Sequence, residues 1–157
     1  MKQFKHNSGF TLIELVVVIV ILGILAATIV PRFTNLHGDA RASVVTGMEA
    51  SVRSAASMYH GVKLAIGSAA GTAVPSNRFE GVGAAVADTL NYPAATLLGI
   101  GALVDDSSGD FTVAVVGGNY TWQYTGATTP LNCGVTYIAS AAAGSPPTIN
   151  IDITNCL

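Results

Sequence analysis

The sequence predicts an α+β protein in which one long N-terminal helix packs against a small antiparallel β-sheet. Three features predict this fold: an apolar run over residues 10–31, a helical repeat of apolar residues over residues 32–61, and four β-rich runs between residues 111 and 153. Hydrophobic residues make up 50% of the 157-residue chain and charged residues only 10%, and the mean hydropathy is +0.53. We therefore expect part of the surface to lie against lipid or another subunit.

The apolar run follows a short basic segment. Residues 1–9 carry Lys2 and Lys5 and no acidic residue, and positive charge before an apolar run holds that end of the chain in the cytoplasm. The run has 22 residues, and Glu14 is its only charged residue. As a helix it reaches about 33 Å, which is enough to cross a hydrocarbon core of about 30 Å.

Glu14 separates three interpretations of this run. A cleaved secretory signal fits poorly, because the run continues beyond its best small-residue site at residues 25–27. A plain single-pass anchor fits the length but leaves a carboxylate in lipid, which costs about 2.5–3.5 kcal/mol near the bilayer centre. If the chain is cut between Gly9 and Phe10, the new α-ammonium of Phe10 lies within about one helical turn of Glu14. The carboxylate then neutralises that amine or a neighbour's, and the pair is cheaper to bury than either charge alone.

The segment Gly9-Phe10-Thr11-Leu12-Ile13-Glu14, between a basic leader and an apolar helix, resembles the N-terminus of type IV prepilins and of the related secretion pseudopilins. The resemblance implies the type IV pilin fold, removal of residues 1–9 by a prepilin peptidase, and methylation of Phe10. It also implies that Glu14 pairs with the N-terminal amine of an adjacent subunit during assembly. Gly23 and Pro31 match positions where the helix loosens in the filament, although an ordinary membrane helix also tolerates both residue types.

The helical pattern continues over residues 32–61. Apolar or small residues recur about every 3.7 positions, close to the helical period, and Glu49 and Arg53 form a favourable i,i+4 pair. We predict one helix to about Gly61, whose stripe packs against its own head or against other helices. His37 and His60 are predicted to be solvated, because neither has a second ligand at i+3 or i+4. The stripe consists of Phe33, Leu36, Ala40, Val44, Met48, Val52, Ala55 and Tyr59.

Residues 62–157 are predicted to form a small head. Residues 62–104 indicate a long connection with short helical pieces such as residues 93–104. The runs 111–116 and 120–124 flank Gly117-Gly118-Asn119, a strong hairpin signal. Runs 134–139 and 148–153 add a third and a fourth strand, and Ile149, Ile151 and Ile153 alternate onto one face of the last. We expect a four-stranded meander whose apolar face lies on the outer half of the helix.

Cys133 precedes the third predicted strand and Cys156 follows the fourth. Antiparallel pairing of those strands brings the sulfurs together, and a bridge there stabilises the fold by roughly 3 kcal/mol. Two free buried thiols are the alternative, less expected outside the cytoplasm. The bridge also fits the resemblance, since pilins have a disulfide-bounded C-terminal region. Within that family the chain resembles the mannose-sensitive haemagglutinin type of pilin, through Pro31-Arg32-Phe33, Asp39-Ala40-Arg41, Asn91-Tyr92-Pro93-Ala94 and the two cysteines.

An enzyme is disfavoured, and neither a cofactor nor a metal is expected. No nucleophile elbow, H-E-x-x-H, P-loop or dinucleotide-binding motif is present, and the predicted head contains no histidine. The acidic run 105–110 does not have the spacing of an EF-hand loop and indicates a solvated turn. The net charge of −2 argues against nucleic acid as the main partner.

The resemblance therefore implies a structural pilin that assembles into a helical homopolymer for adhesion and in some cases motility. The prepilin sits in the bacterial inner membrane, among lipid, the prepilin peptidase and the pilus assembly machinery, before it enters an extracellular filament. Two alternatives remain: a pseudopilin of a type II secretion system, and a membrane-anchored periplasmic binding module. The paired cysteines and the absence of a calcium loop favour the pilus over the pseudopilus.

Overall fold

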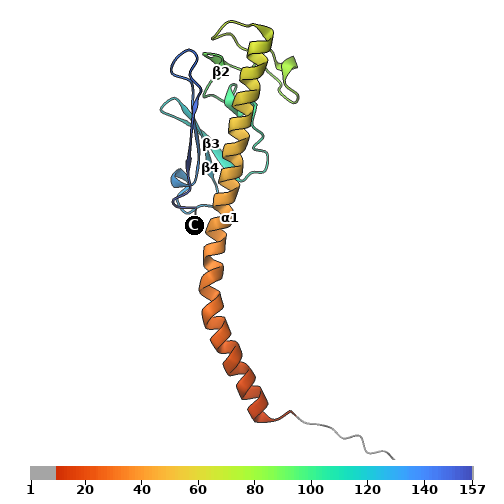
Figure 1. Ribbon diagram of the computed structural model, residues 1–157, viewed down its shortest axis with the longest axis vertical. Helices are drawn as coiled ribbons and strands as arrows, with labels where there is room; N and C mark the ends of the chain where they lie inside the picture. The colour runs from red at the N-terminus through yellow and green to blue at the C-terminus, as the bar shows by residue number, and fades with distance from the viewer. Residues whose placement is uncertain (1–9, 157) are drawn as a thin grey trace, which may run out of the picture. The chain divides into compact units, whose positions relative to one another are not determined.

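The structure is a computed structural model that describes residues 10–156, without the side chains of residues 30–35 and 131. The predictions for residues 1–9, including Gly9, lie outside the described residues. The chain divides into two units, Met1–His37 and Gly38–Leu157. We describe each unit by itself. In the second unit the outer part of helix α1 runs alongside the β-strands (Figure 1).

Helix α1 comprises Leu12–Ile66 and is a single element of 55 residues. It confirms one helix running from the apolar run into the amphipathic stripe. The helix ends at Ile66 rather than near Gly61 because Val62 and Ile66 pack on a buried cluster around Tyr59. Gly67 then stops it with a positive φ of 61°, which glycine adopts without the steric cost of a Cβ.

The outer half of α1 buries one face. Val45 and Val52 are fully buried, and Met48, Ala55 and Tyr59 lie on the same face. The predicted stripe is therefore right from Met48 onward, and here it packs against the chain's own head. Before that point the stripe does not pack on the head, and the alternative of packing on other helices stays a prediction for the exposed positions Leu36, Ala40 and Val44. Phe33 has no described side chain.

The predicted four-stranded meander is confirmed, with each strand boundary within one residue of the expected one. Its strands are β3 (Phe111–Val116), β4 (Asn119–Tyr124), β5 (Gly134–Ile138) and β6 (Thr148–Asp152). They pair antiparallel in the order β3-β4-β5-β6. Gly117 and Gly118, with φ of 59° and 81°, form the tight turn between β3 and β4 because a type I′ turn needs positive φ at both positions.

One face of this sheet forms the head's core with α1. Tyr120, Trp122, Val135 and Tyr137 alternate onto that face and are buried together with Val52 and its neighbours on the helix. The isoleucines of the last strand are less buried than predicted. Ile149 packs on the core, whereas Ile151 is 37% and Ile153 46% exposed. They are exposed because β6 is an edge strand and ends at Asp152.

The connection between α1 and the sheet contains a small hairpin that the sequence did not predict. Its strands are β1 (Asp88–Thr89) and β2 (Tyr92–Pro93). The predicted helical piece over residues 93–104 is wrong, because Pro93 belongs to the hairpin and only the short 3₁₀ helix η2 (Ile100–Ala102) is helical there. Two further 3₁₀ turns are η1 (Ser76–Arg78) and η3 (Pro130–Asn132).

Candidate functional site

The first turn of α1 is closed by a reciprocal pair of hydrogen bonds between Thr11 and Glu14. The backbone N–H of Thr11 donates to Oε2 of Glu14 at 3.0 Å, and the N–H of Glu14 donates to Oγ1 of Thr11 at 3.3 Å. The Thr11 hydroxyl also donates to Oε2 at 2.7 Å. This is a capping box, which the Thr-x-x-Glu spacing favours because both side chains satisfy helix-end amides.

The capping box places the Glu14 carboxylate beside the start of the described chain. The amide that it accepts belongs to Thr11, the residue directly after Phe10, and the Phe10 side chain is 77% exposed. If the chain is cut before Phe10, the new amine would lie one residue before the Thr11 amide that the Glu14 carboxylate already binds. Cleavage after Gly9, methylation of Phe10 and pairing of Glu14 with an amine stay predictions.

The N-terminal part of α1 exposes a continuous apolar surface. Residues Leu12–Ile29 have a mean hydropathy of 3.0 and pass a length and composition test for a membrane span, and none of them is buried. Signal sequences near an N-terminus and buried core helices also pass this test. A core helix would be covered by other parts of its own protein, whereas Leu12–Ile29 is not. This surface therefore needs lipid or another protein to cover it.

Gly23 and Pro31 both lie within α1. A Cβ built on Gly23 meets nothing within 4 Å, so no contact in the described structure requires glycine there. Pro31 is one of the residues whose side chain is not described. The predicted loosening of the helix at these positions stays a prediction.

The predicted bond between Cys133 and Cys156 is present, with a Cα–Cα distance of 4.9 Å. Both cysteines are buried. Nη1 of Arg41 donates to the carbonyl of Cys156 at 3.3 Å, which connects the bridged C-terminal segment to α1. The disulfide thus holds the end of the chain against the outer part of the helix.

A buried polar network that the sequence did not reveal holds the β1–β2 hairpin to α1. Oδ1 of Asp88 lies 3.3 Å from Nζ of Lys63, and the side chains are 0% and 1% exposed. The Tyr59 hydroxyl donates to the same carboxylate at 3.1 Å, and the amides of Gly71 and Asn91 donate to Oδ2. Burial, and then the charge of Asp88, raise the pKa of Tyr59.

The prediction that His60 is solvated is wrong. Its ring stacks on Tyr92 at a centroid distance of 4.3 Å, and Nδ1 lies 3.0 Å from the carbonyl of Asn91. The unpredicted hairpin supplies both partners, which is why the sequence pattern missed them. His37 is exposed, as predicted. No group of three or more metal-ligating side chains occurs among residues 10–156.

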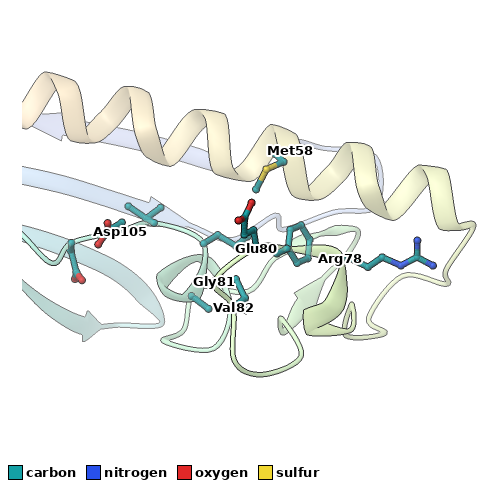
Figure 2. Close-up of a pocket in the computed structure, with 11 residues that line it drawn as sticks. Met58, Arg78, Glu80, Gly81, Val82 and Asp105 are labelled. Carbon is teal, nitrogen blue, oxygen red and sulfur yellow. The ribbon is translucent and has the colours of Figure 1, made fainter.

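An open groove of about 580 Å³ lies beside the outer part of α1. Figure 2 shows Glu80 directing its carboxylate towards Met58 of the helix, while Arg78 extends away. Asp105 lies at the other end and accepts a hydrogen bond from the amide of Ser107 at 2.9 Å, and the bonds from Ser107 lower the pKa of Asp105. The described lining contains no histidine and no nucleophile beside a base, so the groove offers no recognisable catalytic arrangement.

Comparison with known proteins bears on the N-terminal segment. Residues 4–30 match the family model of the prokaryotic N-terminal methylation motif. The chain carries this motif, and with a long apolar helix followed by an antiparallel sheet it has a pilin-like α+β fold. The match covers the N-terminal segment alone, and there the chain is similar to a type IV pilus component and to a type II secretion protein.

Two relatives show the extent of the similarity. A type IV narrow pilus major component, PilA5, of Thermus thermophilus is 57% identical over 47 residues, which is 30% of this chain and 40% of that protein. The type II secretion system core protein G of Pseudomonas aeruginosa is 46% identical over 57 residues, 36% of this chain and 40% of that protein. The chain thus spans about 40% of the length of these relatives. No solved structure matches. The narrower haemagglutinin-type resemblance stays a prediction.

Proposed function

We propose that the chain is the structural subunit of a type IV pilus. The observation that carries the proposal is a helix whose first 18 residues, Leu12–Ile29, are apolar apart from Glu14, are entirely uncovered, and lie within a methylation motif. The same helix, further along, is an ordinary part of a folded head. A filament subunit requires a head with its own core and an apolar segment that other subunits can cover. The head has such a core, and Leu12–Ile29 is such a segment.

The exposed segment Leu12–Ile29, here called the rod, needs an apolar cover both before and after assembly. In the membrane, lipid covers these side chains; in a filament, the rods of other subunits cover them. Keeping apolar surface from water contributes about 25 cal/mol per Å². Identical subunits that make head-to-tail contacts without closing a ring form an open helical polymer.

Processing prepares the rod for this exchange. The prepilin peptidase cuts between Gly9 and Phe10 at the inner membrane, leaving 148 of the 157 residues and removing Lys2 and Lys5. Phe10 is methylated, and the pilus machinery then moves the subunit into a filament on the cell surface. Glu14 accepts the amine of a neighbouring Phe10 and aligns the incoming rod.

Mass spectrometry of protein purified from the producing cells tests the processing step. We expect the N-terminal peptide to begin at Phe10 and to carry one methyl group. A plain membrane anchor or binding module would retain residues 2–9. An intact N-terminal segment would therefore overturn the proposal.

A substitution at Glu14 tests assembly. Glu14→Ala should abolish or strongly reduce filaments in sheared surface fractions, while the protein still accumulates in the membrane. Glu80→Ala is the matched control, because it removes one exposed carboxylate from the head and should leave assembly unchanged. Normal filament yield with Glu14→Ala would contradict the role proposed for Glu14.

A pseudopilin of a type II secretion system is the second candidate, favoured by the similarity to core protein G. The two functions differ in what is lost when this chain is deleted. A pilus subunit leaves the cells without surface filaments and with reduced attachment, whereas a pseudopilin leaves exported proteins in the periplasm. Retained filaments together with blocked secretion would replace the first proposal by the second.

A further inference from the structure

The two edges of the four-stranded sheet are protected unequally. At β6, the strand is preceded by Pro146 and Pro147, and the carbonyl of Ile149 accepts a hydrogen bond from Arg53 at 3.3 Å. Prolines and occupied backbone groups are common ways to stop an edge strand from pairing with another chain. The opposite edge, β3, has the sequence Phe-Thr-Val-Ala-Val-Val, which contains no charge, proline or glycine.

The backbone of β3 has a free side. Hydrogen-bonded pairs alternate along its ladder with β4, starting from Val116 and Asn119 beside the two-residue turn. The bond from the amide of Thr125 to the carbonyl of Asp110, 2.9 Å, fits this alternation. The residues between the bonded positions direct their N–H and C=O groups away from β4. These residues are Phe111, Val113 and Val115.

The side chains at this edge are apolar and exposed. Val113 is 37%, Val115 56% and Val116 55% exposed. Among the described residues, no backbone group bonds to the free side of β3. An uncharged, β-branched strand with unpaired backbone groups is a template for adding a further strand.

We propose that β3 pairs antiparallel with β3 of a second copy in a neighbouring filament and thereby joins filaments side by side. The inference rests on the proposed function, because it needs many copies displayed along one fibre. A single pair of six-residue strands buries far less than the ~1,000 Å² typical of a stable interface. Repetition along two filaments raises the strength of association by avidity without any new kind of contact.

A second copy of β3 fits this edge without opposing like charges, and the free backbone positions set the register. Pairing Val113 with Val113 of the second copy places each Phe111 opposite a Val115, so all three free positions are bonded. The same register sets each Asp110 opposite a Val116, so no carboxylate faces another. β-branched side chains meet across the new pair, which is favourable in sheets.

In this register Val113 lies opposite Val113 of the second copy, so a charged side chain placed there would meet the same charge. In Val113→Lys filaments two lysines are directly opposed, and we expect single filaments instead of bundles in electron micrographs, at unchanged filament yield. Val113→Glu should have the same effect. Mixing the two kinds of filament should restore bundles, because lysine then faces glutamate, and added salt should weaken that restoration.

Val116→Lys is the matched control. It adds the same charge to the same strand at an exposed position but faces Asp110 of the second copy, so bundles should persist. Bundles that persist in Val113→Lys, an unmodified chain that never bundles, or a failure of the mixed filaments to bundle would each overturn the proposal. These outcomes leave the filament function intact. Absence of filaments from the unmodified chain would contradict the proposed function instead.

Discussion

The two halves of helix α1 have the same secondary structure and opposite surroundings. The segment Leu12–Ile29 is apolar on all sides apart from Glu14 and is wholly uncovered. From Val45 to Lys63 the helix is apolar on one face only, and that face is buried under the sheet and the hairpin. The difference teaches that one helix can separate two tasks: its outer half stabilises the head, and its inner half stores apolar surface for association.

The largest expected effect comes from placing a charge in each half. Val52→Asp buries an unpaired carboxylate and should lower the head's free energy of unfolding by more than about 4 kcal/mol. Ile21→Asp should leave the unfolding of the head unchanged and should abolish filaments. Thermal unfolding followed by Trp122 fluorescence, together with filament yield, measures both. Ser54→Asp, at an exposed position of the outer half, is the control and should change neither. A head that unfolds with Ile21→Asp would contradict the division.

The buried network at Asp88 should give the next largest effect. Asp88→Ala leaves Lys63 buried without its counter-charge, with the carbonyl of Thr72 as its remaining acceptor among the described residues, so we expect a loss of about 3–5 kcal/mol in the free energy of unfolding. Urea denaturation measures it. The double variant Asp88→Leu with Lys63→Met removes both charges and should recover part of the loss, because the Tyr59 hydroxyl and two backbone amides still lose an acceptor. A single variant as stable as the parent would show that the hairpin is not held by this pair.

Removing the disulfide tests whether the head can lose stability while the inner half of α1 stays helical. Replacing both Cys133 and Cys156 by serine should lower the free energy of unfolding by about 3 kcal/mol, because the 23-residue separation sets the loop-closure entropy. Urea denaturation of the head gives this value, and reduction of the unmodified chain should reproduce it. The inner half of α1 should remain helical throughout, as circular dichroism in detergent would show.

The smallest expected effect concerns Asp152, next to that disulfide. Hydrogen bonds from Thr154 lower the pKa of Asp152. A lowered pKa stabilises the fold above the ordinary carboxyl value, and this contribution is lost as the pH falls through the lowered value. Thr154→Val removes the hydroxyl bond of 2.6 Å and should raise the pKa of Asp152, as an NMR titration would show. An unchanged pKa would mean that the amide of Thr154 is sufficient.

Elements with a strong local pattern were predictable from the sequence. The four strands of the meander follow alternating apolar residues, and Gly117-Gly118 marks their first turn. The apolar rod and the capping pair Thr11 and Glu14 are equally local. In the stripe, the sequence could not distinguish Val44 from Val45, because adjacent valines both fit a helical period and only the position of the sheet decides which is buried.

Features that depend on distant contacts were not predictable. The β1–β2 hairpin turns at Leu90 and Asn91, with φ of 53° and 73°, and a leucine gives no turn signal. Asp88 and Lys63 lie 25 positions apart in the sequence, so no spacing rule relates them. The stack of His60 on Tyr92 follows from the same hairpin. The predicted meander already made the first strand an edge, but the exposure of its valines became apparent only from the structure.

Both bonds from Thr11 go to Oε2 of Glu14, so Oε1 keeps its lone pairs for another donor. Under the proposed pairing an incoming ammonium binds Oε1 while Thr11 keeps Oε2, and the first helical turn stays closed throughout. One carboxylate thus serves as a helix cap and as a docking contact at the same time, and joining or leaving the fibre requires no rearrangement of the cap.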